Sequence, residues 1–268
     1  MKLTTIGDCC VDIYPQENQS FLGGTAYNRA LKAQSAGAQT TLTSAIGTDS
    51  WGKQYLASLK SHHINTHHLS IIKGKTSYIN ITLDKHKSPQ YSKWQLGVLR
   101  KFKLTPTHKK FLSAQDAIII TYFKPIKHLL ESFIKFSLSQ PLKLADFAGG
   151  SIYSPAIKTI NRFLPHLDIA IRNVDYHNQS ELNYLKSLAK KHRKIILALL
   201  GKHGSLIFTP SKKYYQPAIK TKAKDTTGAG DAYIPVFTIE YLKHQNIKKA
   251  MIKATQATSQ VITQLGAN

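Results

Sequence analysis

The chain alternates short apolar runs of strand length with longer segments of helical period, and this alternation most constrains its fold. Apolar runs that indicate strands occupy residues 3–6, 40–45, 117–121, 142–146, 168–172, 194–200 and 205–209. Segments of helical period occupy residues 25–37, 51–61, 126–139, 155–164, 179–192, 230–244 and 247–263. Buried strands separated by helices of this length are joined by crossovers, so the sequence predicts an α/β fold with a mainly parallel sheet.

One stretch departs from this alternation. Residues 76–83 (TSYINITL) alternate apolar and polar side chains and are rich in β-branched residues, and the segment 91–99 follows a polar turn without helical period. This pattern predicts a small antiparallel hairpin that projects from the main sheet. No linker rich in Pro, Gly or Ser divides the chain, so a single domain is expected.

The charge balance raises the possibility of a polyanionic partner. Lys and Arg number 37 against 14 Asp and Glu, which gives a formal net charge of +23. The basic residues are scattered among polar residues, with short runs such as 190–194, and they form no stripe interleaved with aromatic residues. A nucleic-acid groove needs such a stripe. We therefore expect a solvated basic surface and no specific nucleic-acid partner.

The cysteines and the N-terminal segment indicate the compartment. Cys9 and Cys10 are adjacent, so they form neither an ordinary disulfide nor a spaced pair of metal ligands. No apolar run reaches the length of a membrane span, and Asp8 and Asp12 interrupt the segment where a signal peptide needs apolar residues. These features predict a cytoplasmic protein that does not interact with a membrane.

The strongest local signal is the segment DTTGAGD at 225–231, which directly precedes an apolar-periodic run. Small residues at 228–230 let consecutive backbone N–H groups converge at a helix N-terminus, where they and the helix dipole favour an anion. The Asp231 carboxylate would repel a phosphate that was merely bound, but it suits a group that accepts a proton from an attacking hydroxyl. From these residues alone, a Gly-rich turn capped by an aspartate is an equal alternative.

Two other phosphate-binding patterns fail on spacing. A Walker A loop is excluded at 74–76 (GKT) because Leu69 stands where the first glycine is required. The dinucleotide pattern GxGxxG is excluded at 228–233 because Tyr233 takes the place of the third glycine. The phosphate chemistry therefore rests on the segment 225–231.

A second glycine cluster, FLGGTAYN at 21–28, precedes the first helix. Gly23 and Gly24 allow a ligand to approach the backbone closely, and Asn28 presents a donor and an acceptor that suit vicinal hydroxyls. Taken alone, a simple turn before a helix explains the cluster more readily.

Together these motifs resemble the PfkB family of ribokinase-like carbohydrate kinases. The segments IGDCCVD, GG-x3-N, AIGTDSWG, LLGKHGS and DTTGAGD occur in the family's order and spacing along the whole chain. The resemblance implies a ribokinase-like three-layer sandwich with a mainly parallel central sheet and a small β-lid. It implies a single kinase domain over 1–268, with the lid contributed by about 12–22 and 74–100. It also implies ATP and Mg²⁺, with a monovalent cation as a further candidate cofactor and a homodimer through the lid as a candidate assembly.

The resemblance also assigns roles to single residues. Asp231 matches the catalytic base, and the backbone of Gly228, Ala229 and Gly230 matches the anion hole. The positions that match contacts to substrate hydroxyls are Asp12, Gly23, Gly24 and Asn28. The positions that match the nucleotide site are Gly201, Gly204 and Thr226.

The sequence departs from the family pattern at two places. Many members carry an Asn-x-x-Glu motif that organises phosphate-bound Mg²⁺, whereas here Tyr176 stands in the Glu position after Asn173. Asp175 and Glu181 are alternative ligands, so the metal-binding residues stay unassigned. Pro235 lies inside the helix expected after Asp231, where a proline is expected to bend the helix and shift the anion hole.

Within the family, the opening TIGDCCVDIYPQ and the segment PHLD at 165–168 look most like the kinases of fructoselysine. The resemblance therefore implies ATP-dependent phosphorylation of a primary hydroxyl of a sugar or sugar-amine adduct, with 6-phosphorylation of fructoselysine or another fructosamine as the best match. The alternatives are a kinase for free fructose, ribose or a nucleoside, and a catalytically silent sugar-binding member of the family.

Overall fold

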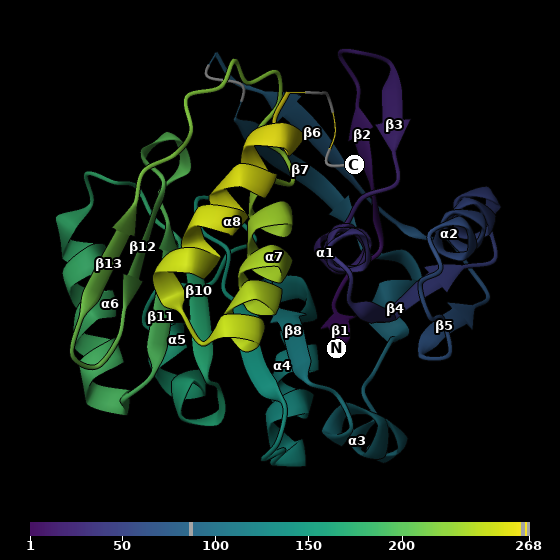
Figure 1. Ribbon diagram of the computed structural model, residues 1–268. Coiled ribbons are helices and arrows are strands. Elements are labelled where there is room, and N and C mark those ends of the chain that lie inside the picture. The colour runs from purple at the N-terminus through teal and green to yellow at the C-terminus, as the bar shows by residue number, and fades with distance from the viewer. Residues whose placement is uncertain (86–87, 264–265, 267–268) are drawn as a thin grey trace.

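The central sheet organises the molecule, for which a computed structural model describes residues 1–85, 88–263 and 266. Its strands are β1 (Lys2–Ile6), β4 (Gln39–Gly47), β5 (Leu69–Ile72), β8 (Ala117–Thr121), β9 (Leu142–Asp146), β10 (Ile169–Asn173), β11 (Ile195–Leu199), β12 (Ser205–Phe208) and β13 (Lys213–Gln216). They form a nine-stranded sheet in the order β13-β12-β11-β10-β9-β8-β1-β4-β5 (Figure 1). Neighbouring strands are parallel except for the pairs β11–β12 and β12–β13. The predicted mainly parallel sheet is confirmed.

Strand β8, near the centre of the sheet, is apolar in four of its five residues because both of its faces are covered. Every side chain of β8 (AIIIT) is buried. Ile119 belongs to the apolar cluster on one face, whereas Ile118 and Ile120 belong to the cluster on the other. A strand buried on both faces needs a continuous apolar run, so its sequence shows no alternation.

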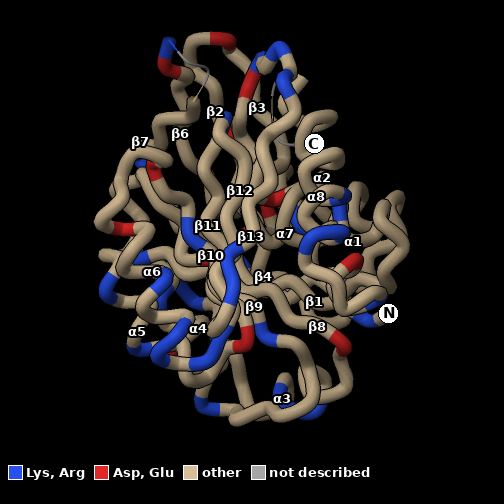
Figure 2. Tube along the Cα trace, turned by 60° about the vertical axis from the view of Figure 1, so that its left-hand side comes forward, with Lys and Arg blue, Asp and Glu red and all other residues tan. Residues whose placement is uncertain are grey.

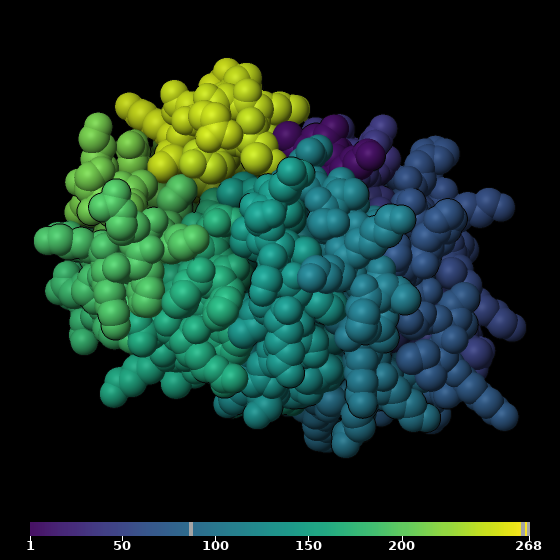
Figure 3. Space-filling model, turned by 90° about the horizontal axis from the view of Figure 1, so that it is seen from below, coloured from purple at the N-terminus to yellow at the C-terminus, as the bar shows by residue number. Residues whose placement is uncertain are grey.

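Helices form the two outer layers. One face is covered by α1 (Thr25–Ser35), α2 (Ser50–Ser61), α7 (Ala229–His244) and α8 (Ile247–Val261). The other face is covered by α3 (Pro106–Ser113), α4 (His128–Phe133), α5 (Thr159–Phe163) and α6 (Gln179–His192). The view from below shows the yellow α8 region beside the purple N-terminal residues, with the teal middle of the chain across the centre (Figure 3). The three layers match the predicted α/β sandwich.

Two of the predicted helices are shorter than expected. The segment 126–139 contains only α4 as α-helix, with 3₁₀ turns at 124–126 and 134–136, and the left-handed Ser137 (φ 50°) ends it. The segment 155–164 contains only α5, followed by a 3₁₀ turn at 164–166. The strand β13 was not predicted, because an edge strand that buries one side only partly carries a weak apolar pattern (KYYQ).

A second sheet stands above the main one in Figure 1. It consists of β2 (Cys10–Tyr14), β3 (Gln19–Phe21), β6 (Ser77–Leu83) and β7 (Pro89–Gln95), in the order β3-β2-β6-β7. The pair β6–β7 is the predicted antiparallel hairpin, and β2 runs parallel to β6. The Trp94 ring contacts Phe123 and Tyr153 edge-to-face and so fastens β7 to loops of the main body.

The charged residues are distributed unevenly over this frame. Figure 2 shows Lys and Arg spread over several elements, among them α4, α5 and α6. Several aspartates are instead buried, as the next section describes. None of the helices in the part of the chain that the structure describes combines the length and the apolar character needed to cross a membrane.

Candidate active site

The first turn of α7 is formed by the segment predicted to bind phosphate. Gly228 is the N-cap of the helix and has φ 78°, a left-handed conformation that glycine adopts without steric strain. The N–H of Ala229 donates to the Thr226 carbonyl at 3.2 Å. The N–H groups of a first helical turn have no acceptor within their helix, so Gly230 and Asp231 present theirs outward at the N-terminus. The positions of Gly228 and Gly230 agree with a phosphate-binding turn, and the Ala229 N–H is already engaged.

Asp225 holds this loop in shape. It is fully buried, and its Oδ1 accepts the Thr227 N–H at 2.7 Å. The hydroxyl of Tyr14 on β2 donates to Oδ2 at 2.8 Å, and the N–H of Gly266 donates to the same oxygen at 3.0 Å. The second sheet and the phosphate loop therefore meet at one buried carboxylate.

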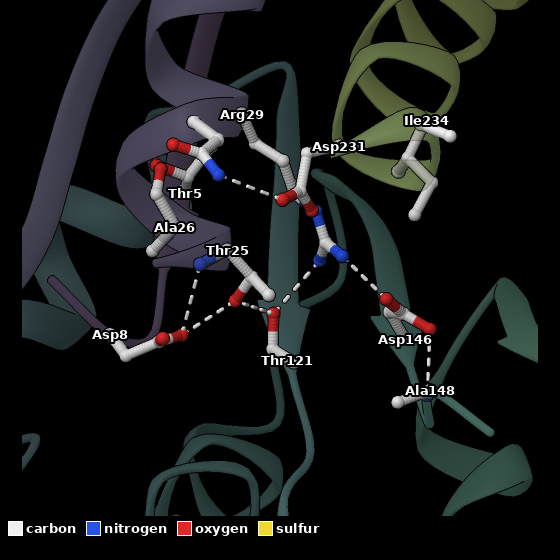
Figure 4. A network of polar contacts seen from close by, with 12 residues as sticks. Thr5, Asp8, Thr25, Ala26, Arg29, Thr121, Asp146, Ala148, Asp231 and Ile234 are labelled. Carbon is white, nitrogen blue, oxygen red and sulfur yellow. Dashed lines mark hydrogen bonds and ion pairs between the residues drawn. The ribbon is translucent and has the colours of Figure 1, made fainter. Parts of the chain in front are cut away.

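Asp231 lies buried in the first turn of α7 and faces α1 (Figure 4). Its Oδ1 accepts from Arg29 Nε at 2.9 Å, and its Oδ2 accepts from Asn28 Nδ2 at 3.1 Å. Burial raises the pKa of Asp231, and the contacts with Arg29 and Asn28 offset only part of that increase. A fixed carboxylate whose pKa is above its ordinary value is well suited to accept a proton.

Arg29 joins three elements through its guanidinium group, and it is only 2% exposed. Beside the bond to Asp231, its Nη2 donates to Asp146 Oδ2 at the end of β9 and its Nη1 donates to Thr121 Oγ1 on β8 at 2.8 Å. Figure 4 shows the guanidinium between the two carboxylates. Thr121 in turn contacts Thr25, whose hydroxyl donates to Asp8 at 2.6 Å.

Neither Arg29 nor Asp146 was predicted from the sequence as a residue of the site. Asp146 ends a buried parallel strand at its carboxyl edge, where ligands bind in sheets of this type, and this position was the available signal. Arg29 is a long cation in a helix whose neighbouring positions, Ala26 and Ala30, are small. An arginine at this position is compatible with an exposed side chain or with a buried side chain paired to a carboxylate, and the sequence does not distinguish the two.

Asn28 connects α1 to the open side of the site. Its Nδ2 is used by Asp231, whereas its Oδ1 is buried and has no hydrogen-bond partner among the described residues. An unpaired buried acceptor costs about 1–3 kcal/mol, so such an atom is expected to receive a donor from a bound molecule. A hydroxyl group carries such a donor.

Gly23 and Gly24 bring the backbone before α1 against β2 and the loop that precedes it. A Cβ on Gly24 would lie 2.5 Å from the carbonyl oxygen of Asp8, and one on Gly23 would lie 2.2 Å from Asp12 Oδ2. The hydroxyl of Tyr55 donates to the Gly23 carbonyl at 2.8 Å and fixes this peptide. The absence of a side chain at Gly23 therefore leaves room for the Asp12 carboxylate, and its absence at Gly24 lets the chain pass close to the backbone of Asp8.

Asp12 is a buried acidic residue on β2. Burial raises the pKa of Asp12 well above its ordinary value, and the nearby carboxylates of Asp8, Asp231 and Asp225 raise it further. The structure thus brings Asn28 and Asp231 into contact, and the charge of Asp231 acts on the nearby Asp12.

The predicted nucleotide residues lie beside the start of α7. Gly201 and Gly204 flank the turn between β11 and β12. The Ser205 hydroxyl is 2.8 Å from the hydroxyl of Tyr233 on α7, and this hydrogen bond holds the turn against the helix. Thr226 belongs to the loop that precedes α7.

The residues considered for Mg²⁺ do not form a metal site. Tyr176 stacks on His203 with 4.4 Å between ring centroids, and Glu181 pairs with Arg172 at 3.9 Å. Asn173 is exposed at the end of β10. Within the described ranges, no three His, Cys, Asp or Glu side chains are placed to hold a metal ion together. These donors do not fit a dedicated Mg²⁺ site built from protein side chains.

The chain is similar to known kinases over its whole length. The pfkB family carbohydrate kinase profile matches residues 5–268. The chain is 26% identical over 265 residues to fructoselysine 6-kinase of Shigella flexneri, covering 99% of this chain and 98% of that protein. It is also 26% identical over 276 residues to ribokinase of Staphylococcus aureus (strain COL), covering 94% and 85%.

A solved structure shows the same fold. The structure of Arabidopsis thaliana ribokinase complexed with ribose and ATP matches with a TM-score of 0.79 and 18% identity, covering 99% of this chain and 93% of that one. The predicted ribokinase-like fold is confirmed. The chain belongs to the PfkB family and is a carbohydrate kinase.

Proposed function

We propose that this kinase transfers the γ-phosphate of ATP to the primary hydroxyl of a fructosamine, with fructoselysine as the leading substrate. One observation carries the proposal. At the N-terminus of α7, Oδ2 of the buried Asp231 lies 3.1 Å from Asn28 Nδ2, and Asn28 Oδ1 has no hydrogen-bond donor among the described residues. A base, a hydroxyl-binding group and a phosphate-binding turn therefore converge at one point.

The reaction follows from this arrangement. Asp231 accepts the proton of the substrate hydroxyl while that oxygen forms a bond to the γ-phosphorus. The bond between the γ-phosphorus and the bridging oxygen breaks, and ADP leaves with the electron pair. The outward N–H groups of Gly230 and Asp231 stabilise the negative charge on the phosphoryl oxygens. Mg²⁺ would enter with the nucleotide, coordinated by phosphate oxygens and water.

The charge of the sugar pocket supports a fructosamine over a neutral sugar. Burial raises the pKa of Asp12, and the negative charges of Asp8 and Asp231 raise it further. A pocket with several carboxylates gains free energy when a cation enters it. A fructosamine carries a secondary ammonium group at C1, whereas fructose and ribose carry none. The fructoselysine 6-kinase relative agrees with this choice.

A neutral sugar is the second candidate, because the ribokinase relative has the same percentage identity as the fructoselysine 6-kinase. The test is ADP release with fructoselysine, 1-deoxy-1-morpholinofructose, fructose, ribose and adenosine. We expect kcat/KM for both amines to exceed that for fructose at least about tenfold, the size of one charged contact. Asp12→Asn should narrow this gap. A higher kcat/KM for ribose or adenosine would contradict the fructosamine assignment, and no ADP release with any compound would indicate a silent binding protein.

The cofactor and assembly predictions belong to the same proposal. Activity should require Mg²⁺, and replacement of Na⁺ by K⁺ tests the monovalent cation. A homodimer formed through the sheet β3-β2-β6-β7 should appear in sedimentation as twice the 29.9 kDa mass of the chain. A cytoplasmic location is expected for an enzyme that uses cellular ATP.

A further inference from the structure

We infer that Arg29 and Asp146 are positioning residues for the proposed base, Asp231. Arg29 holds the carboxylate in place and makes it a weaker base, whereas Asp146 makes it a stronger base by sharing the arginine. This inference rests on the proposed function. It extends it by assigning roles to two residues that do not reach the substrate.

The geometry supports a positioning role for Arg29. All three nitrogens of its guanidinium group are bound, to Asp231, Asp146 and Thr121, and the side chain is 2% exposed. The group therefore cannot also bind the sugar or the phosphate. The planar guanidinium group fixes the orientation of the Asp231 carboxylate by donating to one of its oxygens. Asn28, the preceding residue of α1, donates to the other oxygen.

The charge balance explains the opposite effects. One cation lies between two buried carboxylates, which leaves one negative charge uncompensated. A proton transferred to Asp231 removes that excess charge, and such a transfer is favourable in a buried site. Without Asp146, the same proton would instead leave Arg29 as an uncompensated buried cation. Asp146 therefore strengthens the base by sharing the arginine, and Arg29 weakens it.

The other charged and titratable groups near Asp231 lie on several elements and do not replace this pair. Asp8 and Asp12 add negative charge, whereas Lys32 on α1 adds positive charge and has a pKa that burial lowers. Tyr91 on β7 is half-buried, and burial raises its pKa well above the ordinary value. Within the described part of the chain, none of these four groups hydrogen-bonds to the Asp231 carboxylate, which accepts from Arg29 and Asn28.

The direct test is the acidic limb of the kcat pH profile. Arg29→Met should move this limb to higher pH by about one unit or more, and Arg29→Lys should move it less, because an opposite charge within hydrogen-bonding distance lowers a carboxyl pKa by about 1–3. Asp146→Asn should move the limb to lower pH. The KM for the sugar should change less than kcat in each variant. Arg162→Met and Asp168→Asn remove ion-paired residues elsewhere and should leave the limb in place.

The outcomes separate the two proposals. Opposite displacements by Arg29→Met and Asp146→Asn support the inference, whereas an unmoved limb, or the same direction in both, overturns it. If Arg29→Met does not fold, Asp146→Asn decides alone, because it leaves the pair of Arg29 and Asp231 intact.

A second measurement does not depend on activity. Thermal unfolding of wild type and Arg29→Met should differ more at pH 8 than at pH 5, because the folded pKa of Asp231 lies above its unfolded value and stability falls as pH rises towards it. Removing Arg29 extends this fall to higher pH. The extra pH dependence should shrink in the Asp231→Asn background. If it does so while no sugar is phosphorylated, the proposed function fails and the role of Arg29 stands. If the thermal stabilities of wild type and Arg29→Met depend on pH in the same way, the positioning role of Arg29 is contradicted.

Discussion

The side-chain amide of Asn28 donates to the carboxylate of Asp231 at 3.1 Å, across a separation of 203 residues in the sequence. This contact joins the helix after the glycine pair to the helix after the phosphate loop. A substrate that binds Asn28 Oδ1 therefore also touches the residue that orients the proposed base.

Replacement of the base gives the first prediction. Asp231→Asn should reduce phosphoryl transfer about a hundredfold or more, the usual contribution of a positioned general base, while ATP binding is retained. ADP release measures the first quantity and calorimetric titration with ATP the second. Turnover close to that of wild type would remove Asp231 from the mechanism.

The sugar pocket gives the second prediction. Asp12→Ala should raise the KM of the sugar much more than that of ATP, because it leaves substrate donors unpaired. Asn28→Ala should raise the same KM and also lower kcat, since its amide orients Asp231. Steady-state kinetics with each substrate varied in turn measure these effects. Equal changes in both KM values would mean that these residues only support the fold.

The tie between the second sheet and the phosphate loop gives the third prediction. Tyr14→Phe removes the hydroxyl that donates to Asp225, and all of these groups are buried. The free energy of unfolding should fall by about 1–3 kcal/mol, because the buried carboxyl group loses one hydrogen bond and keeps the one from the Gly266 N–H. Tyr215→Phe is the matched control, since its hydroxyl bonds the His203 carbonyl at an exposed position. Urea denaturation measures both variants. Equal losses of unfolding free energy would show that burial adds nothing to the contribution of the Tyr14 hydrogen bond.

Asp49 gives the fourth prediction. It caps α2 by accepting the Gly52 N–H at 3.0 Å, and it also accepts the Thr76 hydroxyl at 2.6 Å. Burial acts to raise its pKa, but the hydrogen bonds from Thr76 and Gly52 outweigh burial and the pKa is lowered. Asp49→Ala should lose about 1–2 kcal/mol at pH 7.

The pH dependence of that loss has a definite sign. Because the folded pKa of Asp49 lies below the unfolded value, the stabilisation is complete above about pH 4 and disappears as pH falls through the folded pKa. The difference in unfolding free energy between wild type and Asp49→Ala should therefore narrow below about pH 4. A difference that is constant with pH would show that the cap acts without its charge.

The basic surface gives the fifth prediction. Scattered lysines should bind DNA or RNA weakly, and that binding should fade between about 50 and 200 mM salt. Sugar-dependent ADP release should persist at about 150 mM salt, since both substrates are held by directed hydrogen bonds. Filter retention and the kinase assay are run at the same salt concentrations. Tight, sequence-selective retention without ADP release would overturn the kinase assignment.

The fold could be predicted from the sequence because its signals are local. The apolar run 117–121 became β8 with the same bounds, since burial on both faces dictates the composition of each such strand. The turn at the start of α7 could also be predicted, because DTTGAGD places its glycines and its aspartate within a single turn, whereas phosphate binding by this turn stays a prediction. The weakly apolar edge strand β13 could not, because its partner β12 supplies the missing contacts.

The polar network around the base could be predicted only in part. Asn28 and Asp231 were identified because each lies in a recognisable motif. The role of Arg29 depends on Asp146, which is 117 residues away, and on Asp231, 202 residues away. No periodicity encodes the pairing of side chains from different elements, so these contacts emerge only when the sheet brings α1, β9 and α7 together.

Pro235 changes how the first turn of α7 is attached to the rest of that helix. The helix runs from Ala229 to His244 with the proline inside it. Proline has no N–H, so the carbonyl of Asp231, four residues earlier, receives no hydrogen bond from the next turn. The turn that carries the proposed base and the proposed phosphate-binding N–H groups is therefore joined to the rest of the helix by one backbone hydrogen bond fewer. The hydrogen bonds of Asp231 with Arg29 and Asn28 therefore take a larger share in holding this turn in place.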